Sequence, residues 1–513
     1  MGIRRRRWTS VLSLTALSAT LSASAVAADD DAKVKIPRVM MESGEVTNVI
    51  DAFDDDDPFD LNVSLGFQYE TKSARILRES TIFEPGLTTG GYISNMMTVG
   101  QYTENTSRLT PQLDVGIYKD LAFYARFPIV LSNTRSIDEI DGSAGQVNTV
   151  LQGAPGELPL FNLPFESPAR SGLEYIALGL DVNIFNQARD WTKPTWLFGI
   201  ETRISAGEPM HACTASPIDG QQECADPADI NRNGSFDSDI VSPDDPNLNL
   251  EGRNIDGDRG PGITRGTVGL EIHTMMSKRV KYIEPYGGVS ALFEFQQGEN
   301  DFGATDLEGA LVNHPPLRGK ITLGIMFIPW EDREDFGRLT FDLQFAGEYI
   351  SEGRDYSELF DALGSSAARS LRDPKWARFQ DACPDASCDP KSVVDTGSDK
   401  TYFTGLSVVE AHGSYRMAGS ATWQASEYFK LTAGVGFRFD QAHGISHDQP
   451  CNPDFTDNVG ESGPCHTGDS ATGIRATGIP NPAFRAPINS VGRRFYVDES
   501  MTFDVFAKGV VMF

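Results

Sequence analysis

The sequence predicts an all-β fold, a single antiparallel barrel of twelve strands that spans a membrane. Three observations lead to this prediction. Twelve segments alternate apolar and polar side chains, which is the pattern of a strand with one apolar face. The links between these segments are alternately long and short. After the N-terminus, the chain contains no run of the roughly 18 apolar residues that a membrane-spanning helix needs.

The alternation is clearest in residues 60–70, where apolar side chains are separated by Asn, Ser, Gly, Gln and Glu. The remaining eleven segments are 108–118, 121–132, 173–185, 195–206, 263–276, 282–296, 317–328, 339–350, 408–425, 428–440 and 501–513. We expect long loops at 71–107, 133–172, 207–262, 297–315, 351–405 and 441–494. The other five links are short, as in bacterial barrels whose long loops face outward and whose short turns face the periplasm.

The backbone of such a sheet explains why it must close. Hydrocarbon offers no hydrogen-bond partner to an unpaired strand edge, so an exported sheet that lies in a membrane forms a barrel. A soluble, secreted β-sandwich is the alternative, because period-two alternation does not separate the two. Loop lengths, the export signal described next and the terminal Phe513 favour the barrel.

The N-terminus predicts export. Arg4 to Arg7 form a charged region, residues 8–21 are apolar, and Ala25-Val26-Ala27 offers a small-x-small cleavage site. We therefore divide the chain into a signal peptide (1–27), an acidic periplasmic tail (28–59) and the barrel (60–513).

Charge and cysteine content restrict the function classes. The formal charge of -28 excludes phosphate-driven binding of nucleic acid and is compatible with divalent cations. All cysteines fall in long loops, and their close spacing in an oxidising compartment predicts three local disulfides. A metal site is the rival interpretation, although only His466 lies beside one of them. The expected pairs are Cys213–Cys224, Cys383–Cys388 and Cys451–Cys465.

One loop segment has the spacing of a calcium-binding loop. Residues 229–239 place oxygen-bearing side chains at positions 1, 3, 5 and 9, with Gly234 at position 6, and resemble the EF-hand-like loops of extracellular proteins. Position 12 is Ile240 instead of Glu, so another acid must substitute. An acidic turn without a ligand remains the alternative. The expected Ca²⁺ ligands are Asp229, Asn231, Asn233, Asp237 and Asp239.

The polar face of the strands is the main candidate functional surface, since it faces the barrel interior. Its charges are of both signs, so the lumen is either a narrow aqueous pore or filled by charge pairs, and a twelve-strand barrel is compatible with both. The expected lumen-lining residues are Asp114, Arg126, Asp181, Glu201, Arg203, Glu271, Lys320, Asp342, Arg416, Arg438, Asp440 and Lys508.

The loop 351–405 contains apolar residues at helical spacing between Leu359 and Leu371. We expect a short amphipathic helix despite Gly364. Two roles remain open for it: local packing within the loop, or a lid over or inside the barrel.

Two features resemble known families of outer-membrane protein. The terminal strand, which ends on Phe513, resembles the assembly signal of Gram-negative outer-membrane barrels, and this implies the barrel assembly machinery and membrane lipid as partners. The segments LAFYARFPIVL and GLEYIALGLDVNIF resemble the phenol-degradation type of outer-membrane channel. This resemblance implies passive passage of small solutes across the cell outer membrane.

Two other functions are kept as alternatives. One is a barrel with a closed lumen that serves a structural or envelope-export role. The other is a lipid hydrolase, since His412-Gly413-Ser414 resembles the His-x-Ser pair of the outer-membrane phospholipase family. We assign His412 and Ser414 to the lumen, whereas in that family the pair faces lipid, so we expect no enzyme.

Overall fold

The computed structural model describes most of the barrel and parts of its loops. The described residues are 46–50, 52, 60–84, 91–140, 150–153, 159–215, 223–224, 260–297, 301–302, 310–332, 335–366, 368–372, 403–452, 466–470, 473–476, 479–481 and 483–513. Among the helices of these residues, none combines the length and the apolar run needed to cross a bilayer.

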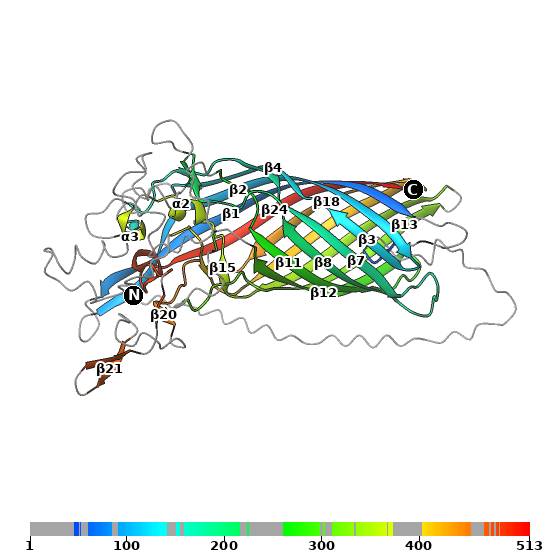
Figure 1. Cartoon of the computed structure of the whole chain (residues 1–513). Helices are drawn as coiled ribbons and strands as arrows, with labels where there is room; N and C mark the ends of the chain where they lie inside the picture. Colours follow the sequence, from blue (N-terminus) through cyan, green and yellow to red (C-terminus); the bar gives the residue numbers. More distant parts are fainter. Residues whose placement is uncertain are drawn as a thin grey trace, which may run out of the picture.

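Twelve antiparallel strands form a closed ring, which confirms the predicted fold class (Figure 1). β1 pairs with β2 on one side and with β24 on the other, so the first and last strands close the barrel. In chain order the ring contains β1 (Leu61–Glu84), β2 (Gly91–Tyr118), β3 (Leu121–Arg126) continued by β4 (Ile129–Asp138), β6 (Arg170–Leu173) continued by β7 (Tyr175–Phe185), β8 (Thr195–Ser205), β11 (Thr267–Ser277), β12 (Ile283–Gln296), β13 (Arg318–Asp332), β14 (Gly337–Ile350), β17 (His412–Ser426), β18 (Phe429–Asp440) and β24 (Phe495–Met512).

The apolar face of each strand points outward, as the alternation predicts. On β18 the apolar side chains from Phe429 to Phe439 are exposed, several by 39–56 %, whereas Lys430 and Asp440 on the opposite face are buried. A soluble sheet hides its apolar face, but here that face covers the outside of the ring. The barrel therefore presents an apolar outer surface to lipid and a polar inner surface to its lumen.

The predicted loop 71–107 is wrong over most of its length. β1 continues to Glu84 and β2 begins at Gly91, so the first hairpin extends well beyond the other strands. Its ladder stays paired from Leu77 to Glu84. The outward residues of this extension, such as Thr71 and Ser73, are polar, and this hid the strand from a search for an apolar face.

The predicted strand 121–132 is divided at Pro128, which has no N–H to donate. The neighbouring groups keep the sheet together, because Phe127 N–H donates to the Pro111 carbonyl at 3.0 Å and Glu174 N–H donates to the Pro128 carbonyl at 2.9 Å. The barrel wall is thus continuous here.

Short elements lie outside the ring, most of them at the end of the barrel away from the C-terminus (Figure 1). The strands are β5 (Phe165–Glu166), β9 (Cys213–Thr214), β10 (Glu223–Cys224), β15 (Gly353–Asp355), β16 (Ser407–Val409), β19 (His443–Gly444), β20 (Cys451–Asn452), β21 (His466–Ser470), β22 (Gly473–Ala476) and β23 (Ile479–Pro480). The helices are α2 (Phe360–Gly364), α3 (Arg369–Arg372) and α5 (Ala486–Asn489).

The helix expected in the loop 351–405 is two short helices, α2 and α3, instead of one. α2 ends at Gly364, where a Cβ atom would lie 2.3 Å from the Cβ of Ala212 and 2.7 Å from the Thr404 carbonyl oxygen. The close approach of these segments therefore requires glycine at this position.

The elements at this end of the barrel share an apolar core, which is separate from the apolar outer surface that faces lipid. Leu359 and Leu363 of the loop pack with Ile76 of β1, Val99 of β2 and Phe495 of β24, all at most 1 % exposed. The long loops thus fold into a cap with its own core on top of the barrel.

Replacing Val435 by Arg tests the outward orientation. Val435 lies on the lipid face in the middle of β18, so the charge should destabilise the barrel by about 2–4 kcal/mol. Ser420, whose neighbour Gly419 pairs with Val435, lines the cavity on the inner side of the wall. Ser420→Arg is therefore the control at the same depth and should cost little. Urea titration of the barrel in lipid vesicles measures both, and equal losses would contradict the assignment of the two faces.

Candidate functional site in the barrel lumen

The inner wall contains a chain of ion pairs that links strands distant in sequence. Glu201 on β8 is only 3 % exposed and accepts bonds from Arg126 on β3 at 2.7 Å, from Arg203 at 2.6 Å and from the Tyr124 hydroxyl at 2.9 Å. Arg203 also pairs with Glu271 on β11. The structure thus brings four of the expected lumen residues together in one network.

A second group lies on the strands across the lumen. Arg416 on β17 donates to Asp504 on β24 at 2.7 Å, and Arg438 on β18 lies 3.3 Å from Glu70 on β1. Asp504 is 1 % exposed. In both pairs one strand lies between the partners, β18 in the first and β24 in the second. Pairing of these opposite charges offsets part of the cost of desolvating them.

The other expected lumen residues also have identifiable surroundings. Asp342 accepts from the Tyr286 hydroxyl at 2.9 Å, Asp181 lies 3.0 Å from His273 Nε2, and Asp114 accepts from Gln112 at 2.6 Å. Lys320 stands opposite Glu348 in the ladder, and Lys508 stands opposite Gly66.

The His412 and Ser414 side chains do not form a nucleophile–base pair. The Ser414 hydroxyl donates to Asp440 at 2.6 Å. The His412 ring lies 2.9 Å from the Glu410 carbonyl oxygen through Nδ1 and stacks on His443. Ser414 thus serves as a hydrogen-bond donor within the wall.

A cavity of about 380 Å³ lies in the lumen between β1, β14, β17 and β24. Gln68, Gln344, Arg416 and Phe506 line it, together with small residues of the wall. Its volume falls in the range of sites that hold small molecules. The lumen therefore contains space for a small solute, bounded by amide, charged and aromatic groups.

The end of the barrel with the short turns is occupied by part of the N-terminal segment. Val49 packs against Ala122 of β3 and Leu197 of β8, and the Thr47 hydroxyl lies 2.6 Å from that of Ser277 on β11. The described residues 46–50 of the acidic N-terminal segment therefore lie against the barrel wall at this end. Alternation between the buried Thr47 and Val49 and the exposed Asn48 lets this short segment lie against the inner wall.

The opposite end is crossed by residues 355–361, which we call the acidic segment. Its carboxylates pair with five cations of the wall, which we call the basic collar. Asp355 lies 2.8 Å from Arg265 and 3.5 Å from Arg318; Glu358 lies 2.7 Å from Lys72; Asp361 lies 2.6 Å from Arg170 and 3.7 Å from Arg135. The sequence patterns singled out none of these residues, because most of them fall in segments predicted as loops.

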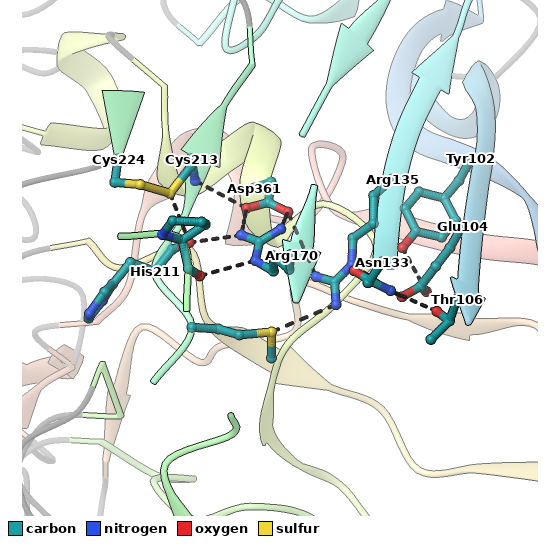
Figure 2. Close-up of polar contacts among 12 residues, drawn as sticks. Tyr102, Glu104, Thr106, Asn133, Arg135, Arg170, His211, Cys213, Cys224 and Asp361 are labelled. Atoms are coloured by element: carbon teal, nitrogen blue, oxygen red, sulfur yellow. Dashed lines mark hydrogen bonds and ion pairs between the residues drawn. A yellow bond between two sulfur atoms is a disulfide. The ribbon is translucent and has the colours of Figure 1, made fainter. Parts of the chain in front are cut away.

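Figure 2 shows the most buried of these contacts. The Arg170 guanidinium donates both terminal nitrogens to Asp361, at 2.6 and 2.9 Å, and the Cys213 N–H donates to the same carboxylate at 3.1 Å. Arg170 also donates to the His211 and Pro261 carbonyls. All three nitrogens of the guanidinium therefore donate hydrogen bonds, as a buried charge requires.

The pKa of Glu358 reflects its place in this cluster. Burial of the carboxyl favours its neutral form, but the Lys72 ammonium and the nearby His443 outweigh this effect and hold the pKa of Glu358 below its ordinary value. Glu358 is therefore ionised and paired at neutral pH.

The structure contains one of the three expected disulfides, Cys213–Cys224. Cys451 makes no disulfide within the described part of the chain, and its expected partner Cys465 lies outside that part, as do Cys383 and Cys388. The calcium loop 229–239 also lies outside it, so Ca²⁺ binding stays a prediction. The described residues contain no cluster of three or more His, Cys, Asp or Glu side chains suited to a metal ion.

Comparisons with known proteins find distant likenesses among solved structures only. No protein-family description and no curated protein matches the chain. The chain is similar to the COG4313 outer membrane channel from Pseudomonas putida F1, with 9 % identity, a TM-score of 0.34, and 92 % of this chain and 99 % of that chain covered.

It is also similar to a Pseudomonas aeruginosa FadL homologue, at 8 % identity and a TM-score of 0.30 over 88 % and 90 % of the two chains. It is similar as well to the toluene transporter TodX of Pseudomonas putida, at 6 % identity and a TM-score of 0.30, with 88 % of this chain and 89 % of that chain covered. Likenesses this distant carry no information about solutes. The structure itself shows that the chain is a transmembrane β-barrel, closed by the pairing of its first and last strands and apolar on its outer face.

Replacing Glu201 by Gln should destabilise the barrel more than replacing Glu271 by Gln. Glu201 neutralises two arginines, and its loss leaves both without their shared carboxylate, whereas Glu271 pairs with Arg203 alone. We expect a difference of about 1–3 kcal/mol, since both arginines remain partly exposed. Urea unfolding followed by tryptophan fluorescence measures it. Equal midpoints for the two variants would contradict the central role of Glu201.

The lowered pKa of Glu358 predicts a pH-dependent contribution to stability. The Lys72–Glu358 pair stabilises the protein at pH values above the ordinary Glu pKa of about 4.3, and this contribution disappears as the pH falls through the lower folded-state pKa. At pH 7, Glu358→Gln should therefore cost about 1.5–3 kcal/mol. Near pH 2 the variant and the natural protein should unfold at similar urea concentrations, and a difference that persists there would contradict the assignment.

Proposed function

We propose that this protein is an outer-membrane channel for the passive passage of small polar solutes. The observation that carries the proposal is the combination of a lipid-facing exterior with a charged inner wall around a cavity of about 380 Å³. A barrel that served only as an anchor needs no solute-sized space on its inner wall. The paired charges of the wall provide hydrogen-bonding groups without a large net field of one sign.

The covered ends imply that transport requires movement. The described N-terminal residues are held by a small set of contacts, chiefly those of Thr47 and Val49, with Ile50 packed against the same cluster. Burying one Val side chain contributes about 1.5–3 kcal/mol. Displacement of this segment therefore costs little compared with unfolding a strand, and we propose that it opens the periplasmic side.

A closed barrel with a structural or export role is the second candidate. The observation in its favour is the presence of inserted chain at both ends of the lumen. Under this alternative the wall charges serve stability alone, and removal of an inserted segment produces no ion flow.

We also propose that the chain is exported through cleavage after Ala27 and that its terminal strand, which ends on Phe513, is recognised by the barrel assembly machinery of a Gram-negative cell. N-terminal sequencing of the protein recovered from outer membranes tests the first point. The mature chain should begin at Ala28, the residue that follows the proposed cleavage site, or at a close neighbour. A mature N-terminus elsewhere would contradict the proposed cleavage.

Single-channel recording in planar bilayers tests the channel. Val49→Asp places a carboxylate against apolar wall residues, so it should raise the open probability severalfold. The adjacent Asn48→Asp adds the same carboxylate at an exposed position and should leave the recordings unchanged. Deleting residues 46–52 should act as Val49→Asp does. Absence of conductance in the natural protein and in the deletion variant would reject the channel in favour of the closed barrel.

A further inference from the structure

The acidic segment reaches opposite sides of the barrel. Its partner Lys72 belongs to β1, and its partner Arg318 belongs to β13, five strands away along one side of the ring and seven along the other. Arg135 on β4 and Arg170 on β6 hold it from a third direction. A segment with partners on such distant strands must cross the opening of the lumen.

The charges at this crossing are balanced. The three carboxylates of the acidic segment, with Glu104, Glu294 and Asp440 of the wall, face the five cations of the basic collar. Each collar cation has at least one carboxylate within 4.0 Å. The crossing is therefore polar without a large excess of one charge.

Apolar anchors distinguish this crossing from the N-terminal segment. Leu359, Phe360 and Leu363 are each at most 1 % exposed, and they pack into the cap through two different clusters. The aromatic rings of Tyr356 and Phe360 pack edge to face, with their centroids 4.7 Å apart. Lifting the acidic segment from the opening requires exposing all of these side chains together. Displacing the described N-terminal residues exposes Val49, part of Ile50 and the small Ala52.

The disulfide supports the same position. Cys213, fully buried and bonded to Cys224, offers its N–H to Asp361, and its neighbour His211 offers a carbonyl to Arg170. The backbone around the disulfide thus fixes both members of the central ion pair.

We propose that the acidic segment is a fixed size filter at the outer mouth of the channel, and that Asp361 is the residue that positions it. This inference rests on the proposed channel function and deepens it. Solutes enter beside the segment, the size limit of transport is set there, and opening and closing occur at the other end. Asp361 acts through its contacts with Arg170, Arg135 and Cys213 and is a positioning residue.

The test is the size dependence of solute uptake by proteoliposomes. Swelling rates are compared for arabinose, glucose, sucrose and raffinose, using the natural protein and Asp361→Asn. The variant leaves the buried Arg170 without its carboxylate, so the segment should shift and the uptake of the larger sugars relative to arabinose should rise severalfold. Glu331→Gln is the control, because it disrupts an equally buried pair with Arg279 at the opposite end of the barrel. Its size profile should match that of the natural protein.

A second variant covers the case in which Asp361→Asn does not fold. Residues 355–366 are replaced by a Gly-Ser linker of equal length, which removes the three carboxylates of the segment and its apolar anchors. If sugars are taken up but both variants keep the size profile of the natural protein, the proposed role of the acidic segment as a size filter is wrong, whereas the proposed channel function is supported. If neither the natural protein nor the linker variant admits arabinose, even with residues 46–52 deleted, the channel itself is wrong.

Discussion

The structure depends on one constraint, the pairing of every strand edge within the membrane. β1 meets this constraint by bonding to β2 along one edge and to β24 along the other, and the Leu61 and Phe513 backbones bond to each other at the seam. Once the ring is closed, the alternation of side chains has a single solution: apolar groups face lipid, and the groups between them face a lumen. The ion pairs of the wall and the position of the cap follow from that closure.

Inside the barrel, pairing of opposite charges offsets the free-energy cost of removing charged side chains from water. Glu201 collects two arginines from different strands, and Asp504 pairs with Arg416 across β18. Glycine makes room for the larger groups, since a Cβ at Gly179 would lie 2.2 Å from the Tyr124 ring. These arrangements leave a hollow between β1, β14, β17 and β24 while the rest of the wall is tied together.

Inserted chain lies at both ends of the lumen, but it is held there by different contacts. At the end with the short turns, a few residues before the first strand lie against the wall. At the other end, the long loops build an apolar core, and an ionic crossing is fastened to that core and to the collar. The acidic segment is anchored by three buried apolar side chains, and the N-terminal segment is held by fewer contacts. In the proposed channel the N-terminal segment is therefore the movable element and the acidic segment the fixed one.

Sequence reasoning succeeded where the membrane imposes a simple pattern. The apolar faces of β18 and of residues 501–513 could be predicted, because every second side chain of these stretches lies on the outer surface. The predicted first strand ends at residue 70, well before the end of β1, because the next outward side chains, Thr71 and Ser73, are polar and do not show an apolar face. The pairing of Glu201 with Arg126, 75 residues away, depends on strand register, and spacing in one sequence does not encode it. The acidic segment was visible as a helical pattern, but its role depends on cations from five separate parts of the chain.

Spin labels placed one at a time at residues 429–440 of the protein in lipid vesicles test the central claim most directly, with collision rates measured against oxygen and against a water-soluble nickel complex. Odd-numbered positions should collide mainly with oxygen, which concentrates in the bilayer, and even-numbered positions should be protected from it. Equal oxygen accessibility on both faces, or access of the nickel complex to the odd-numbered positions, would contradict a barrel that separates lipid from a polar lumen.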